Sequence, residues 1–299
     1  EVCFMSRQNG SGHLAALCAN SIWGGAFVAA QIALEAMSPT VLMFLRITIA
    51  VIATTIIHPR PLGWLGWKTE GYYVLGGLLG IFFYYYLQNA ALTYTSASNV
   101  SVLCALAPIV TALAAPLLLR TPRPHGLFYF GCLLAAAGSA LTVYNGSAVL
   151  QLNPRGDVLA LLNAVVWGLY AIVSKKISSF GHPLIPSVRK MFVYALLFSV
   201  VLLLFQGVQV QPEQLVRWDV LGSVAYLGLL GSTVSYLLWN YAIHRLGSVR
   251  ATTYIYLEPL VTMAVAAAML GDSITWIALL GAVLIIGGLF LTKLKQAGA

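Results

Sequence analysis

Two charged side chains stand out because they fall inside long apolar segments of the sequence. Arg46 lies in the segment 39–57, and Glu258 precedes Pro259 in the segment 249–270. An arginine in the middle of a membrane helix costs about 2.5–3.5 kcal/mol on insertion scales, so its head group must face other helices, pair, or extend to the surface. Arg46 is therefore an anchor for a substrate carboxylate, a gate of the outer half, or a structural group that snorkels or binds a carbonyl. Glu258 is either the candidate for proton coupling or a partner of a neighbouring Lys or Arg.

Four asparagines in apolar segments form a second polar pattern. Two of them occupy matching positions in segments of similar sequence, and the other two each come about one helical turn before a tryptophan. Such amides either line a cavity or hydrogen-bond a neighbouring helix, an interaction worth about 0.6–2 kcal/mol. Both interpretations stay open for Asn20, Asn89, Asn163 and Asn240.

Aromatic residues gather in the same apolar segments, as in the run 82–86. Tyr and Trp present an apolar surface with a polar tip, which suits a cavity for an amphipathic or aromatic solute. Consecutive helical residues point around the whole helix, so at most about half of such a run can face one cavity, and the rest pack elsewhere. The candidates for the cavity wall are Trp23, Tyr86, Trp167, Trp239 and Tyr256.

These candidates lie on segments that occur twice in the chain. Residues 84–121 align without a gap with residues 235–272, and Val110-Thr111 falls on Val261-Thr262. The same frame matches Pro108 with Pro259, and a proline inside a helix frees a backbone carbonyl. Interruptions at corresponding positions of two halves point to the binding site of a transporter. Pro108 and Pro259 are thus helix-break candidates, with a simple packing kink as the alternative.

Composition places the chain in lipid. It has 299 residues, of which 60% are hydrophobic and 8% are charged, whereas a soluble domain carries about 25% charged residues. The net charge of +8 is spread over the loops, which is typical of a membrane surface and not of a nucleic-acid partner. No cysteine, histidine or nucleotide-binding motif has the spacing of a metal, cofactor or enzyme site. We expect none of these groups.

The apolar segments predict an all-α membrane protein, a bundle of ten transmembrane helices. A helix needs about 20 mostly apolar residues to cross the hydrocarbon. Five helices form a first repeat at 13–144 and five a second at 157–294, and the two repeats share one bundle. The predicted spans are 13–34, 39–57, 71–92, 98–119, 125–144, 157–177, 184–206, 219–243, 249–270 and 275–293.

Lysine and arginine then set the orientation, because they are enriched in cytoplasmic loops. With the N-terminus inside, the outer loops hold only Arg155 and Arg217. Both termini are therefore predicted to be cytoplasmic, and an odd number of spans per repeat inserts the second repeat upside down relative to the first. The inner loops and tails then collect Arg7, Arg60, Lys68, Arg120, Arg123, Lys175, Lys176, Arg245, Arg250, Lys293 and Lys295.

Several motifs resemble a known family. The run 22–27 (IWGGAF), Ser38-Pro39 and Phe44-Leu-Arg46 look like the opening of an EamA-type module of the drug/metabolite transporter superfamily. Leu257-Glu-Pro-Leu260, followed by Leu270-Gly-Asp272, is similar to the signature of that module's fourth span. In the first module Ala107 stands where the second has Glu258, and Arg120-Thr121 replace the acidic position. The resemblance implies a ten-helix bundle with a central cavity, and a homodimer through the fifth and tenth helices.

The repeat and the resemblance together favour a secondary transporter in the cytoplasmic membrane. It would export small organic metabolites, such as amino acids or similar amphipathic or aromatic solutes, by alternating access between two halves. Its partners would be the small-molecule substrate, the lipid bilayer and, through Glu258, coupled protons. A passive channel and a membrane-embedded enzyme are the alternatives.

Overall fold

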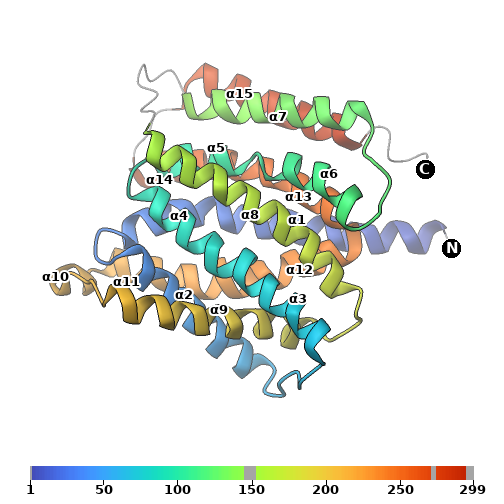
Figure 1. Ribbon diagram of the computed structural model, residues 1–299. Coiled ribbons are helices and arrows are strands. Elements are labelled where there is room, and N and C mark those ends of the chain that lie inside the picture. Colours follow the sequence, from blue (N-terminus) through green and yellow to red (C-terminus); the bar gives the residue numbers. More distant parts are fainter. Residues whose placement is uncertain (1, 145–152, 271–273, 294–299) are drawn as a thin grey trace.

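The computed structural model describes residues 2–144, 153–270 and 274–293 (Figure 1). Asp272 of the fourth-span motif, and residue 294 at the predicted end of the second repeat, lie outside the described residues.

The described residues form helices joined by short loops, with one isolated bridge between Met37 and Val210 and no strand among them. The α-helices are α1 (Val2–Ala33), α2 (Pro39–Ile57), α3 (Trp67–Gly77), α4 (Tyr84–Leu92), α5 (Ala97–Cys104), α6 (Ala107–Leu118), α7 (Gly126–Tyr144), α8 (Pro154–Ser178), α9 (Leu184–Gln206), α10 (Pro212–Leu215), α11 (Trp218–Ala225), α12 (Ser235–Leu246), α13 (Ser248–Thr252), α14 (Glu258–Leu270) and α15 (Trp276–Lys293). Two π-helices, η1 (Leu78–Phe83) and η2 (Tyr226–Val234), and a 3₁₀-helix, η3 (Thr253–Leu257), continue neighbouring α-helices.

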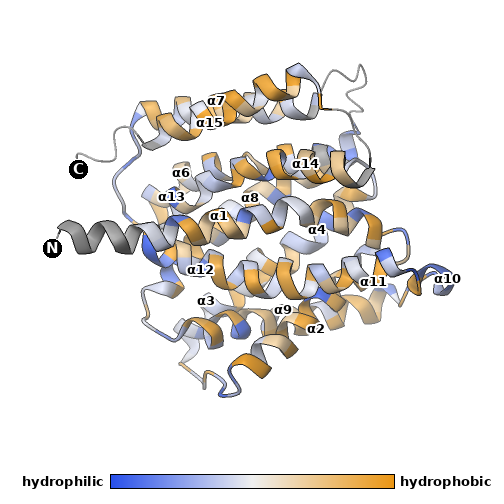
Figure 2. Ribbon diagram, turned by 180° about the vertical axis from the view of Figure 1, so that it is seen from behind, coloured by the Kyte–Doolittle hydropathy of each residue, from blue (hydrophilic) through white to orange (hydrophobic). Residues whose placement is uncertain are grey.

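Many of these helices suit a membrane. Within the described part of the chain, six helical stretches are long and apolar enough to cross it, and two shorter apolar helices accompany them at 126–142 and 276–292. Apolar residues cover the flanks of the helices, and hydrophilic residues gather toward the loops (Figure 2). The fold is therefore that of an all-α, multi-pass membrane protein.

Helical interruptions occur at matching places in the two halves. Both η1 and η2 sit in mid-segment and insert a wider turn. The segment with Pro108 breaks between α5 and α6, and the segment with Pro259 passes from η3 into α14. A proline cannot donate to the preceding turn, so each helix restarts with its proline in the first turn, where the missing N–H costs nothing.

The matched Val-Thr pairs tie each half to the other. The Thr262 hydroxyl donates to the Gly24 carbonyl at 2.9 Å, and the Thr111 hydroxyl donates to the Gly168 carbonyl at 3.2 Å. A Cβ added at Gly24 would lie 2.5 Å from Val261, and one added at Gly168 would lie 2.8 Å from Val110. The sequence repeat therefore becomes a repeated contact in space, which closes both halves around one centre.

Helices α7 and α15 form a separate layer beside the rest of the bundle (Figures 1 and 2). They meet through small residues: a Cβ at Gly131 would lie 2.7 Å from the Gly288 carbonyl, and one at Gly138 would lie 2.6 Å from the Gly281 carbonyl. In lipid, where no hydrophobic force drives helices together, such close backbone approach provides the packing energy.

The bundle has two chemically different ends. We call the end that carries residues 58–66 and 179–183 the basic end, and the opposite end, with residues 34–38 and α10, the acidic end (Figure 1). At the acidic end Ser38 N–H donates to the Gln209 carbonyl at 3.0 Å, and Gln211 N–H donates to the Ala36 carbonyl at 2.8 Å. These main-chain bonds join a loop of the first half to a loop of the second.

Candidate functional site

Four aromatic residues from both halves meet in the middle of the bundle. The Trp23 ring centroid lies 5.0 Å from that of Trp167, 5.4 Å from that of Trp239 and 5.6 Å from that of Tyr236. All four side chains are buried, and edge-to-face pairs of this kind contribute about 0.5–1.5 kcal/mol each beyond their burial. We call these four residues the aromatic centre.

The two π-helices supply hydrogen-bond acceptors to the aromatic centre. Trp23 Nε1 donates to the Gly231 carbonyl of η2 at 2.8 Å, and the Tyr236 hydroxyl donates to the Gly80 carbonyl of η1. Gly80 and Gly231 fall on each other in the sequence repeat. An aromatic residue of each half therefore binds an interrupted helix, at the type of helix defect that is frequent at functional sites.

Arg46 lies next to the aromatic centre and is 1% exposed. Its Cζ stacks 3.9 Å from the centroid of the Tyr85 ring, and Nη1 donates to Gln88 Oε1 at 3.4 Å. Among the described residues, Arg46 Nε has no hydrogen-bond partner. The guanidinium thus faces into the bundle with donors to spare, and it does not snorkel to either surface.

Glu258 is the buried acidic group of the centre, with 3% exposure. No hydrogen bond or ion pair holds its carboxylate among the described residues. The start of α14 packs on α1 beside the aromatic centre: a Cβ added at Gly24, the residue after Trp23, would lie 3.0 Å from the Glu258 carbonyl. Among the described residues, the buried Arg46 and the buried Glu258 form no ion pair with each other.

The predicted amides take different places. Asn20 Nδ2 donates to the Ala16 carbonyl, and Asn163 Nδ2 donates to Cys104 Sγ; both leave a buried Oδ1 without a partner among the described residues. Asn240 is bonded on both sides: it accepts from Ser174 at 2.6 Å and donates to the Tyr170 hydroxyl at 2.9 Å.

Three other candidates lie away from the aromatic centre. Asn89 Nδ2 donates to the Pro39 carbonyl at 3.2 Å, which holds the start of α2. The Tyr86 hydroxyl accepts from Gln206, the last residue of α9, at 3.5 Å. Tyr256 faces α7, where its hydroxyl lies near the Cys132 thiol. Their placement favours packing roles for all three.

The sequence did not single out several residues of this site. Tyr84 and Tyr85 belong to the aromatic run 82–86, but only the depth and rotation of the helix show that they face inward while Tyr86 does not. Gln88 lies one turn beyond Tyr84 and donates to its hydroxyl at 3.4 Å; the i, i+4 spacing could have linked these two residues, but no signal in the sequence links Gln88 to Arg46 on another helix.

Fold and site together define a multi-pass membrane transporter. Buried charges of both signs at mid-bundle, helix interruptions at matching positions, and two halves in one bundle are the features of that class.

The chain belongs to the EamA-like transporter family, whose model matches it twice, at residues 10–144 and 154–294. It is 27% identical over 97% of its length to an uncharacterized transporter of Archaeoglobus fulgidus, of which 99% is covered. It is 28% identical to a probable amino-acid metabolite efflux pump of Escherichia coli, with 96% of this chain and 95% of that protein covered.

Two further similarities are of the same extent. The chain is 29% identical to a probable terminal-alkyne amino-acid exporter of Streptantibioticus cattleyicolor, with 92% of this chain and 91% of that protein covered. A solved crystal structure with 20% sequence identity superposes with a TM-score of 0.75 over 95% of this chain and 98% of that chain, which supports the fold.

Proposed function

We propose that the protein exports amino acids, or similar small amphipathic solutes that carry both a carboxylate and an ammonium group. The observation that carries the proposal is that Arg46 and Glu258 are both buried next to the aromatic centre and form no ion pair among the described residues. The guanidinium would hold the substrate carboxylate, the Glu258 carboxylate would hold the ammonium group, and the Trp and Tyr rings would contact the side chain.

Relatives support this substrate class. Two similar proteins are described as a probable amino-acid metabolite efflux pump and a probable terminal-alkyne amino-acid exporter. A zwitterion binds both charged groups at once, so each buried charge gains a partner that the described residues do not give it.

The proposed mechanism is alternating access between two inverted five-helix halves, ten spans in all, in the cytoplasmic membrane. The basic end would face the cytoplasm, since lysine and arginine are retained on that side. Protonation of Glu258 would release the ammonium group, so a proton gradient would drive the exchange.

Counterflow in proteoliposomes tests the proposal. Protein reconstituted with an excess of unlabelled L-leucine inside should accumulate external labelled L-leucine transiently, and L-phenylalanine should compete. We expect Arg46→Gln and Glu258→Gln each to reduce the initial rate at least roughly tenfold, because each leaves one substrate charge unpaired. Arg155→Gln, an exposed change at the acidic end, is the matched control.

Other outcomes separate the alternatives. Saturation without counterflow would indicate a passive channel, and no flux of any amino acid would refute the proposal. If Glu258→Gln transports leucine normally but no longer responds to a pH gradient, Glu258 carries the proton alone and the ammonium group binds elsewhere.

We also propose a homodimer through α7 and α15, the helices of the fifth and tenth predicted spans. Their outer faces expose Phe130, Leu133, Val283, Ile286 and Phe290. Cross-linking of Leu133→Cys between copies in native membranes should give a disulfide-linked dimer, whereas Leu204→Cys, also exposed but on α9, should not.

A further inference from the structure

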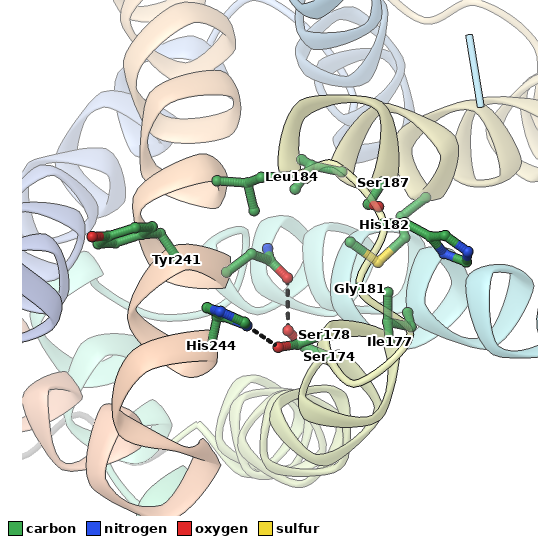
Figure 3. Close-up of a pocket in the computed structure, with 12 residues that line it drawn as sticks. Ser174, Ile177, Ser178, Gly181, His182, Leu184, Ser187, Tyr241 and His244 are labelled. Atoms are coloured by element: carbon green, nitrogen blue, oxygen red, sulfur yellow. Dashed lines mark hydrogen bonds between the residues drawn. The ribbon is translucent and has the colours of Figure 1, made fainter. Parts of the chain in front are cut away.

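A cavity lies at the basic end, and neither Arg46 nor Glu258 lines it. Its volume is about 240 Å³, and residues of α8, α9 and α12, with the loop 179–183, form its walls (Figure 3). We call it the basic-end pocket. A cavity of this size accommodates one small solute and is below the usual range of about 300–1,000 Å³ for drug-sized ligands.

Hydroxyl, amide and imidazole groups form the polar part of the pocket. Ser178 shares a hydrogen bond of 2.7 Å with His244, and Ser174 donates to Asn240 (Figure 3). His182 and Ser187, on the opposite wall, are both bonded to the Tyr73 hydroxyl. The apolar part consists of Ile177, Leu184, Val188 and Met191, and the lining includes neither a carboxylate nor a lysine or arginine.

One layer of side chains separates the pocket from the aromatic centre. Asn240, which lines the pocket, donates to the Tyr170 hydroxyl at 2.9 Å. The Tyr170 ring in turn lies 5.0 Å from that of Trp167. Asn240 and Tyr170 thus stand between a solute in the pocket and the rings of the centre.

The charges around the pocket favour an anionic group. Lys175 Nζ donates to the His244 carbonyl at the rim, and Arg245 is the next residue. Within the described part of the chain, Glu70 is the acidic residue at the basic end, and it pairs with Lys190. The lining itself is uncharged, so the attraction for an anion comes from the bases at the rim, whose positive potential raises the local concentration of anionic ligands.

We infer that the basic-end pocket is a loading site for a small amphipathic carboxylate. The carboxylate would accept hydrogen bonds from the Ser and His groups, and an aliphatic tail would lie against Leu184, Val188 and Met191. This inference rests on the proposed function, because it places the pocket before the central site on the export path. It adds a distinct selectivity: the pocket requires the carboxylate but not the ammonium group, since no acid lines it.

Protection of a single introduced thiol tests the inference. In a protein with Cys3→Ser and Cys18→Ser, the variant Leu184→Cys places a thiol in the pocket, and the adjacent Ile185→Cys, outside the lining, is the control. Labelling by a small methanethiosulfonate in detergent is timed with L-leucine, with 4-methyl-2-oxopentanoate, which lacks the ammonium group, and with isopentylamine, which lacks the carboxylate.

We expect leucine and the oxo acid to slow the labelling of the Leu184→Cys variant at least fivefold, and isopentylamine to have no effect. Ser178→Ala should raise the half-protecting leucine concentration about tenfold. Equal protection by isopentylamine, protection of the Ile185→Cys control to the same extent, or no protection of the thiol at position 184 would each overturn the inference.

Flux assays keep the two claims apart. Leucine counterflow without protection of the thiol at position 184 would leave the proposed function standing and remove the loading site. Protection of that thiol without leucine counterflow would support binding in the pocket and refute the proposed amino-acid export. The central site should also discriminate where the pocket does not, so the oxo acid should protect the Leu184→Cys variant and yet fail to exchange for leucine, because it lacks a group for Glu258.

Discussion

At the scale of single residues, Arg46 is a buried charge whose position is fixed by its neighbours while most of its N–H donors stay available for a ligand. A guanidinium has five N–H donors, and the structure assigns it one acceptor, Gln88 Oε1, and the face of the Tyr85 ring. The Tyr85 hydroxyl donates to Ser232 Oγ at 2.7 Å, which fixes the ring from the other half of the bundle. The head group is thus oriented but not saturated.

Arg46→Lys tests that orientation. An ammonium group keeps the charge but loses the planar stack on Tyr85 and the forked donors. A cation–π contact away from water contributes about 2 kcal/mol, so we expect leucine counterflow to fall roughly 10- to 30-fold, mainly through a higher half-saturating concentration. Arg155→Lys, at an exposed position, should change neither quantity. Normal kinetics in Arg46→Lys would contradict the anchoring role.

Gly80 is a second residue whose type is dictated by its neighbours. A Cβ there would lie 2.2 Å from the Tyr170 ring, and the Gly80 carbonyl accepts from Tyr236. We expect Gly80→Ala to destabilise the protein by about 1–3 kcal/mol, the usual range for overpacking. Gly222→Ala on α11, where nothing lies within 4 Å of the added carbon, should not lower the unfolding temperature. Thermal unfolding in detergent measures both.

At the scale of elements, α9 clamps the loop between α2 and α3. Arg189 Nη1 donates to the His58 carbonyl at 2.6 Å, and Lys190 Nζ donates to the Gly63 carbonyl at 2.7 Å and to Glu70. Arg189 and Lys190 are neighbours on the seventh predicted span. Both bind one loop of the other half at the basic end. Backbone bonds between residues 36–38 and 209–211 do the same at the acidic end. The proposed alternating access would require one of these two contacts to open at a time.

The fall of stability at low pH tests the contact that α9 makes with the loop between α2 and α3 at the basic end. Burial raises the pKa of Glu70, but hydrogen bonds from Lys190, Tyr194 and the Leu65 N–H outweigh burial, so the pKa is lowered overall. A lowered folded-state pKa contributes stability above the unfolded value of about 4.3, and this contribution is lost as the pH falls through the folded value. We expect Glu70→Gln to cost about 1.5–3 kcal/mol at pH 7 and to flatten the loss of stability below about pH 5.

The control for Glu70 is Glu213→Gln, an exposed acid at the acidic end. Its unfolding temperatures, measured from mildly acidic to neutral pH, should be those of the unmodified chain. If the unfolding temperature of Glu70→Gln falls with decreasing pH as steeply as that of the unmodified chain, Glu70 does not stabilise the contact between α9 and this loop.

At the scale of the whole molecule, charge is separated along the bundle axis. The described acids of the acidic end are Glu35, Asp157, Glu213 and Asp219, and Arg217 pairs there with Glu35 at 2.9 Å. The basic end carries Arg60, Lys68, Arg120, Arg123, Lys175, Lys176, Arg189, Lys190, Arg245 and Arg250. This polarity is the basis of the proposed orientation and of the ligand class of the basic-end pocket.

Accessibility labelling in intact cells checks the orientation. A membrane-impermeant maleimide should label Glu213→Cys from outside, and it should label Ser179→Cys, at the basic end, only after the membrane is permeabilised. Both positions are exposed, so a difference reports sidedness and not burial. Labelling of Ser179→Cys in intact cells would contradict the proposed orientation.

The sequence alone determined the class of the protein and its repeat. A chain with 8% charged residues cannot cover a water-facing surface, so the helical membrane fold follows from composition. The matched Val-Thr pairs and prolines identify the segments that occupy equivalent places in the two halves. Arg46 and Glu258 could be named as unusual because the cost of a buried charge is read directly from its apolar neighbours.

The tertiary structure decided which of the named residues meet. Trp23, Trp167 and Trp239 converge, whereas Tyr86, Asn89 and Tyr256 face other helices. The reason is rotational: in a helix that is apolar on every side, the sequence has no polar face to show which way it turns. The π-turns η1 and η2 shift that rotation again, and only contacts between the halves, such as Tyr236 with Gly80, fix it.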